Sequence, residues 1–192
     1  MTVVREILLG SRRKLAGQIA AVSSDQRGAS ALEFALFAGL LVFGVLNTVD
    51  ISIYIYKRMQ VENATEMAVQ AAWKACDPSN GFLPATTSCP ALNNAITGGA
   101  QSTSLGDQVS IEAGSPSEGY YCLNDSGALQ LISGITSTAP PADCSVTGLP
   151  GQAPGDYIQI TTTFAYVPLF PGVTVASFFT TPITKTAMMR LN

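Results

Sequence analysis

An almost uncharged segment near the N-terminus places the strongest constraint on how this chain folds. From Phe34 to Tyr56 the only charged side chain is Asp50. That run is long enough for a helix that crosses a bilayer, which needs about 20 residues. A helix is the natural form for such a segment, because hydrocarbon offers the backbone no hydrogen-bond partners. We therefore predict a transmembrane helix over residues 29–56.

The flanking charges predict the orientation of this helix. The N-terminal leader is basic, with Arg5, Arg12, Arg13, Lys14 and Arg27 against Glu6 and Asp25. Such a flank stays on the cytoplasmic side of a membrane. Tyr54, Tyr56 and Lys57 suit the opposite interface, where aromatic rings and cations with long apolar stems lie. We interpret Asp50 as a marker of that boundary, with pairing to Lys57, Arg58 or a partner helix as the alternative.

The helix is expected to continue beyond the membrane. Residues 57–75 are rich in helix formers. Small apolar side chains recur there at three-to-four spacing, at Val61, Ala64, Ala68, Ala71 and Ala72. One helix should therefore run from about Ala29 to about Ala75. Asp77-Pro78 should end it, because proline disfavours helix in the residue before it.

The rest of the chain has the composition of a loop-rich β domain, with frequent Gly, Pro, Ser and Thr. Tyr157–Tyr166 is the clearest predicted strand, since Ile158, Ile160 and Phe164 alternate with polar side chains. We further predict strands at 109–113, 120–123 and 183–191, a short helix at 91–96, and an irregular segment at 124–155 with a helical turn at 128–132.

The predicted fold class is α+β: a long N-terminal membrane-spanning helix followed by a small antiparallel-sheet domain with long disulfide-stapled loops. The chain would consist of a cytoplasmic leader at 1–28, the transmembrane helix at 29–56, a helical extension outside the membrane at 57–75 and an exported β-rich domain at 76–192.

Four cysteines, Cys76, Cys89, Cys122 and Cys144, all follow the apolar run. None forms a C-x-x-C pair, which argues against a zinc or thioredoxin-like site. An even number in an exported, loop-rich segment favours two disulfides over free thiols. Of the three possible pairings we favour the sequential one, Cys76–Cys89 and Cys122–Cys144, because each bridge closes a short loop. Such a bridge contributes about 3 kcal/mol in the chain-entropy model.

Composition argues against several classes of function. Charged residues make up 12% of the chain, against about 25% in soluble domains, as expected for a chain partly embedded in a membrane. The net charge of −3 argues against a nucleic-acid partner. There is no histidine, so the commonest general base and transition-metal ligand is missing. We expect no enzymatic activity, no cofactor and no bound metal.

Glu33 lies at the mouth of the apolar helix and needs an explanation, because a charge at the bilayer centre costs about 2.5–3.5 kcal/mol on insertion scales. One interpretation is that Glu33 only marks the headgroup boundary. The other adds a cut after Gly28, which gives Ala29 a new, positively charged α-amino group. Glu33 would then lie in the first helical turn, where a negative charge is favoured. There it would pair with the terminal amine of a neighbouring subunit and set the axial register.

A known family has this pattern. Gly28, a few small or apolar residues, then Glu33 and Phe34 before a long apolar run resemble the class III signal peptide of type IV prepilins. RGASALEFALFAGLLVFGV resembles in particular the N-terminus of the TadE-like minor pseudopilins of tight-adherence (Tad) pili. PGDYIQITTTFAYVPLFPG and ITKTAMMRLN match the C-terminal part of that family in style. Residues 76–153 match it only loosely.

This resemblance implies a bacterial inner-membrane protein that crosses the membrane once, with a cytoplasmic N-terminus and a periplasmic C-terminal domain. It implies cutting by a prepilin peptidase between Gly28 and Ala29, and an assembly role for Glu33 and Phe34. The other implied partners are pilus subunits, minor pilins and the inner-membrane assembly platform. The body is larger than that of a major Tad pilin, which favours a minor role in pilus initiation, assembly or at the tip of the extracellular pilus.

The alternative function is that of a single-pass anchored periplasmic ligand-binding or enzymatic domain. That hypothesis leaves Gly28 with Glu33 unexplained. The sequence also lacks the GxSxG nucleophile motif and the phosphate-binding P-loop. We therefore favour a structural assembly protein.

Overall fold

The computed structural model describes residues 26–76, 79, 82–135 and 141–191. The chain divides into two compact units, Met1–Val49 and Asp50–Asn192. Helix α2 (Gln26–Ala75) supplies the described part of the first unit and the opening segment of the second. The predicted leader lies outside the described residues up to residue 25, as does the predicted helix stop at Asp77-Pro78.

The long helix predicted from the sequence is confirmed, and its two parts differ in what surrounds them. In the first unit the large apolar side chains of α2 are exposed; Leu40, for example, is 70% exposed. In the second unit the small apolar stripe predicted at three-to-four spacing is buried in the core. Val61, Ala64, Ala68 and Ala72 of the predicted stripe are buried, as is Val69, whereas Ala71 is half-buried. The two parts of α2 therefore suit different surroundings: the first exposes apolar side chains, and the second buries an apolar stripe against a core.

The second unit contains a five-stranded antiparallel sheet arranged around β4 (Gly155–Phe164). Along one edge β4 pairs with β5 (Ile183–Arg190), from Tyr157↔Arg190 to Phe164↔Ile183. The other edge is shared, because β2 (Ser117–Leu123) pairs with the first half of β4 and β1 (Val109–Ile111) with its last residues. The hairpin partner of β2 is β3 (Leu129–Gly134).

The alternation predicted for the central strand is confirmed, since Ile158, Ile160, Thr162 and Phe164 are all buried. Each fully buried isoleucine contributes about 1.5–3 kcal/mol relative to an exposed one. The helical turn predicted at 128–132 is wrong, because these residues start strand β3. The turn before β3 is built on Asn124, whose Oδ1 accepts hydrogen bonds from the backbone N–H groups of Ser126 and Ala128.

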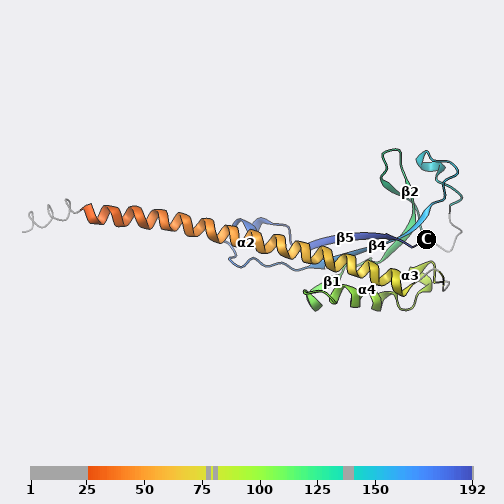
Figure 1. The fold of residues 1–192 in the computed structure, drawn as a ribbon, viewed down its shortest axis with the longest axis horizontal. Coiled ribbons are helices and arrows are strands. Elements are labelled where there is room, and N and C mark those ends of the chain that lie inside the picture. Colours follow the sequence, from red (N-terminus) through yellow and green to blue (C-terminus); the bar gives the residue numbers. More distant parts are fainter. Residues whose placement is uncertain (1–25, 77–78, 80–81, 136–140, 192) are drawn as a thin grey trace, which may run out of the picture. The chain divides into compact units, whose positions relative to one another are not determined.

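Polar contacts fix α2 on the sheet of the second unit. The hydroxyl oxygens of Thr65 on α2 and Thr162 on β4 lie 2.7 Å apart in the buried core. Nearer the surface, Lys185 of β5 donates to the carboxylate of Glu62 at 2.7 Å. This contact lowers the pKa of Glu62, chiefly through the hydrogen bond from Lys185. Figure 1 shows β4 and β5 running beside this part of α2.

Two short helices, α3 (Ala85–Ser88) and α4 (Leu92–Gln101), complete the core. The predicted short helix at 91–96 is therefore present and extends to Gln101. It buries Leu92, Ile96 and Ala100. Among the described elements there are also 3₁₀ turns at Gly106–Gln108 (η2), Ser145–Thr147 (η3) and Val175–Phe178 (η4).

The two disulfides join Cys76 to Cys89 and Cys122 to Cys144. This is the sequential pairing favoured from the sequence. The first bridge ties the end of α2 to the segment between α3 and α4, and the second ties β2 to the start of η3. The predicted fold class is confirmed: a long apolar N-terminal helix, an antiparallel sheet and disulfide-stapled loops.

Candidate functional site

The predicted processing motif lies on the first turns of α2. Gly28, Glu33 and Phe34 are exposed, and no other part of the described chain lies within 4 Å of a side chain built at Gly28. Within the described residues, a side chain at position 28 would therefore have open space around it. Ala29 occupies a helical position directly after Gly28. Within the described residues, Gly28, Glu33 and Phe34 are therefore accessible to other molecules.

An exposed apolar surface follows the motif along α2. Ten large apolar side chains between Leu32 and Val49 are exposed. Among the described residues α2 is the one helix long and apolar enough to cross a membrane, with a mean hydropathy of 2.0 in its most apolar stretch. A core helix of a soluble protein would be mostly buried, yet only 6% of that stretch is buried. This surface is suited to lipid or to neighbouring apolar helices.

Asp50 opens the second unit and is fully buried. Its Oδ1 accepts a hydrogen bond from the backbone N–H of Leu169 at 2.8 Å, and its Oδ2 accepts one from that of Phe170 at 3.3 Å. The hydroxyl of Thr174 also donates to Oδ2. We call this arrangement the Asp50 site. An ionised carboxylate is purely an acceptor, so three donors compensate for its burial.

The Asp50 site corrects one expectation from the sequence. The alternative partners considered there were Lys57, Arg58 and a foreign helix, but the carboxylate is held by a loop of its own chain. Lys57 instead places its Nζ 5.5 Å from the centre of the Phe164 ring.

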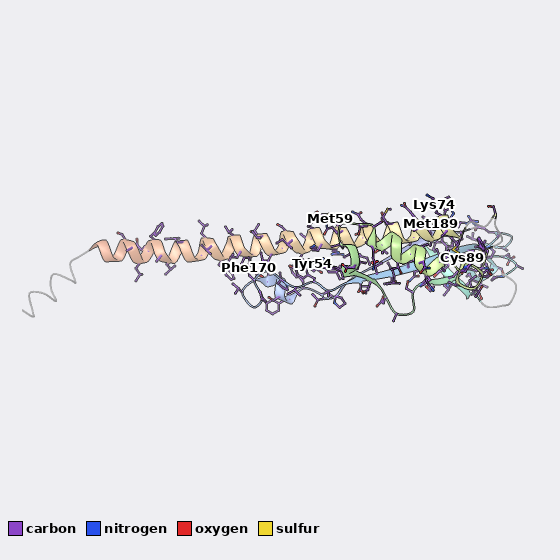
Figure 2. The ribbon with its side chains drawn as sticks, turned by 90° about the horizontal axis from the view of Figure 1, so that it is seen from below. Tyr54, Met59, Lys74, Cys89, Phe170 and Met189 are labelled. Carbon is purple, nitrogen blue, oxygen red and sulfur yellow. A yellow bond between two sulfur atoms is a disulfide. The ribbon has the colours of Figure 1, made fainter. Side chains whose placement is uncertain are left out.

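Aromatic contacts continue this attachment along α2. The ring of Tyr54 packs edge-on against Tyr166, at 5.1 Å between centroids, and at a tilt against Phe179, at 4.6 Å. The Tyr166 hydroxyl donates to the main-chain carbonyl of Asp50 at 3.3 Å. Figure 2 labels Tyr54 and Phe170, whose segments lie beside each other here. The loop after β4 is therefore firmly attached to the helix.

A second polar group lies around Asp156 on β4. The side chain of Asp156 is 6% exposed, and its Oδ1 has no hydrogen-bond partner within the described part of the chain. Burial, together with the nearby Glu118 carboxylate, raises the pKa of Asp156 to about 7. A cavity of about 350 Å³ adjoins it, lined by Leu83, Pro84, Tyr120, Ala153, Pro154, Asp156 and Arg190.

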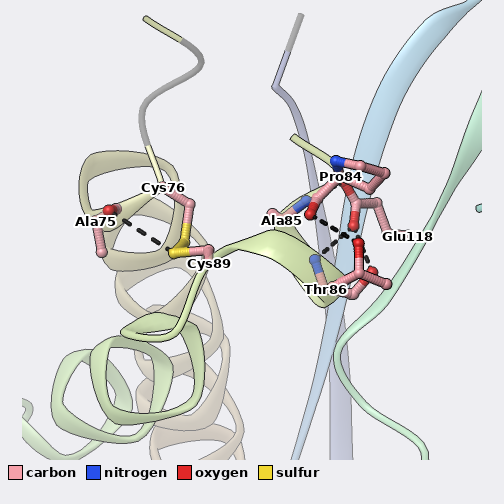
Figure 3. The surroundings of a disulfide bond; sticks show 8 residues. Ala75, Cys76, Pro84, Ala85, Thr86, Cys89 and Glu118 are labelled. Carbon is pink, nitrogen blue, oxygen red and sulfur yellow. Dashed lines mark hydrogen bonds between the residues drawn. A yellow bond between two sulfur atoms is a disulfide. The ribbon is translucent and has the colours of Figure 1, made fainter. Parts of the chain in front are cut away.

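Glu118 on β2 has a clear structural role beside that cavity. Its carboxylate accepts hydrogen bonds from the backbone N–H groups of Ala85 and Thr86, at 2.8 and 2.7 Å, and from the Thr86 hydroxyl at 2.6 Å. Figure 3 shows these bonds beside the Cys76–Cys89 bridge. They satisfy donors at the start of α3 that a helix leaves unpaired. The raised pKa lets Asp156 hold a proton near neutral pH, but the described residues that line the cavity include no serine, cysteine or lysine nucleophile.

Sequence reasoning missed the Asp50 site and the Asp156 group. The loop residues that hold Asp50 lie 119 to 124 positions away from it in the chain. The available signal was Asp50 itself, a lone charge inside an apolar run. Asp156 carried no signal beyond its place at the start of a strand whose neighbours are buried.

These features define an α+β protein: an N-terminal helix that can span a membrane is followed in the chain by a disulfide-stapled domain. The family model described as TadE-like protein matches residues 28–70. The match starts at Gly28, covers the exposed apolar surface and the Asp50 position, and ends within α2. It confirms the TadE-like resemblance predicted from the sequence. No curated protein and no solved structure matches the chain.

Proposed function

We propose that this chain is a minor pseudopilin of a Tad-type pilus, a structural component without catalytic activity that acts in pilus initiation, assembly or at the tip. The observation that carries the proposal is the TadE-like match, which begins at the residue before the predicted cut. The exposed motif and the exposed apolar surface of α2 support it, because a pseudopilin uses both for contacts with other subunits.

In this proposal the chain passes through successive states, from a membrane-bound precursor to an assembled subunit. The precursor lies in the bacterial inner membrane with its N-terminus in the cytoplasm and its disulfide-stapled domain in the periplasm. A prepilin peptidase cuts between Gly28 and Ala29. The mature helix then packs among other pilus subunits at the assembly platform.

Glu33 would act in lateral assembly. After the cut, the amine of Ala29 and the carboxylate of Glu33 both lie on the first turns of the same helix. In a bundle of staggered helices the carboxylate of one subunit can meet the amine of the next. Such a pair fixes the stagger, because either charge alone would resist burial among apolar helices.

The test is a Glu33→Ala variant, assayed for pili and for co-purification with pilus subunits, with an immunoblot of the processed form. We expect insertion, processing and folding to persist while assembly fails, and Glu33→Asp to give an intermediate result because its reach is shorter. Glu66→Ala is the matched control, since Glu66 is an exposed glutamate further along the same helix. Normal piliation by processed Glu33→Ala protein would leave Glu33 as a boundary marker and would contradict the proposal.

A further inference from the structure

The loop between β4 and β5, residues 165–182, exposes an unusual amount of apolar surface. No charged residue occurs between Asp156 and Lys185. Five large apolar side chains of this β4–β5 loop are exposed: Val167, Leu169, Val173, Val175 and Phe178. Phe178 reaches 89% exposure. Single exposed apolar residues are ordinary on proteins, but several on one loop indicate an interaction surface.

This loop is held in place, so its exposed side chains are presented in a fixed position. The Asp50 site binds its backbone at Leu169 and Phe170. Thr174 and Ala176 are buried between the exposed residues, and the ring of Phe179 packs on Tyr54. The burial of alternate residues leaves Val173 and Val175 directed outwards.

The attachment point places the loop at one end of the candidate membrane segment. Asp50 directly follows Val49, the last of the ten exposed large apolar side chains that α2 carries in the first unit. Residues 30–49 form 20 helical positions (49 − 30 + 1), and at 1.5 Å per residue they span about 30 Å, the thickness of the hydrocarbon core. The loop is thus fixed to the first residue beyond a segment of membrane-spanning length.

We propose that the β4–β5 loop inserts its exposed apolar side chains into the lipid surface of the leaflet that faces the exported domain. The proposal rests on the membrane insertion of α2 proposed above. It ends the membrane span at Val49, short of the Tyr56 boundary predicted from the sequence. It also explains how a carboxylate is accommodated at that depth, because the loop supplies its hydrogen-bond donors.

Lipid fits this surface better than a protein partner because the exposed side chains of α2 shortly beyond Asp50 include an aromatic ring and a cation suited to a membrane interface. Tyr56 is 56% exposed, and aromatic rings of this kind favour the membrane interface. Arg58 is exposed and lies eight positions (58 − 50) beyond Asp50, about 12 Å along the helix. That is the level at which a cation meets headgroup phosphates. An aromatic ring and a cation are therefore exposed within about 12 Å of Asp50 along the helix, among apolar side chains such as Ile55 and Met59, as a bilayer interface accommodates.

The test uses the full chain in phospholipid vesicles and a single tryptophan as a depth probe. The chain has one tryptophan, Trp73, so Trp73→Phe combined with Phe178→Trp moves the probe to the loop. Lipids brominated near the headgroup end of the acyl chain should quench most of its emission, and lipids brominated near the chain end should quench less. Unaltered Trp73 is the negative control, because it lies roughly 35 Å beyond Asp50 along the helix and should not be quenched.

A third variant separates failure of this inference from failure of the proposed membrane span. Trp73→Phe combined with Phe37→Trp places the probe on the exposed apolar part of α2. If Phe37→Trp is quenched and Phe178→Trp is not, α2 spans the membrane and the loop proposal is wrong. If neither is quenched, the membrane span itself is wrong. An unquenched Phe178→Trp whose emission shifts to the blue only when pilus subunits are added would assign the loop to a protein interface and would also overturn the proposal.

Discussion

The packing of α4 against α2 depends on one glycine, and its neighbour offers an internal control. A β-carbon at Gly99 would lie 2.7 Å from the main-chain oxygen of Met67 and 2.7 Å from the β-carbon of Ala71, whereas one at Gly98 would meet nothing within 4 Å. Neither glycine has a positive φ. We therefore compare Gly98→Ala with Gly99→Ala.

The expected magnitudes combine two separate effects. Alanine in place of glycine stabilises a helix interior by up to about 1 kcal/mol, and this gain applies to both variants. Only Gly99→Ala adds the contact with the backbone of α2, and overpacking of this kind costs about 1–3 kcal/mol. The helix would have to move outwards, which weakens the contacts of Ile96 and Ala100 with the core. The difference between the two variants isolates the overpacking effect at about 1–3 kcal/mol.

Urea unfolding of the full chain in mild detergent measures this difference. Trp73 is the single tryptophan and lies on α2 close to Ala71, so its fluorescence reports the region directly. We expect Gly98→Ala to raise the unfolding midpoint and Gly99→Ala to fall below it at an unchanged slope. Equal midpoints for the two variants would show that α4 does not approach α2 as described and would refute the reasoning.

Two further predictions concern the same unit. Since burial raises the pKa of Asp156 to about 7, the folded chain retains a proton that the unfolded chain releases above about pH 4. The free energy of unfolding should therefore fall as pH rises from about 4 to about 7, by at most about 1.4 kcal/mol per pH unit. Asp156→Asn should flatten that dependence in urea titrations, and an unchanged slope would contradict the role of this carboxyl group. Replacing both Cys76 and Cys89 by serine opens a loop of sequence separation 13 and should lower the free energy of unfolding by about 3 kcal/mol; a loss below about 1 kcal/mol would show that this loop is constrained without the bridge.

The parts of the fold that depend on local pattern were predictable. The long helix is encoded by an apolar run followed by a small-residue stripe, and β4 by strict alternation over several residues. Strand β3 was missed because both of its faces are largely exposed, so its sequence carries no alternation. Its better signal was the turn-forming Asn124–Gly127 segment before it.

The candidate sites also divide into those that a local sequence pattern predicts and those that only the tertiary structure forms. Gly28 and Glu33 stand out because an exposed motif with fixed spacing is visible along the chain. The Asp50 site depends on a loop that returns to the helix after more than a hundred residues, and no local pattern records that pairing. Asp156 owes its raised pKa to the packing of β2, β4 and the Leu83–Pro84 segment around it, which is a property of the tertiary structure.

The most direct test of the proposed pseudopilin role is the N-terminus of the chain after co-expression with its prepilin peptidase. Intact mass and N-terminal sequencing should show a mature protein that starts at Ala29. A charged residue at Gly28 should block the cut, whereas Gly39→Ala, at another exposed glycine of α2 with nothing within 4 Å, should not. A full-length chain that persists beside a peptidase shown to cut another pilin would contradict the assignment.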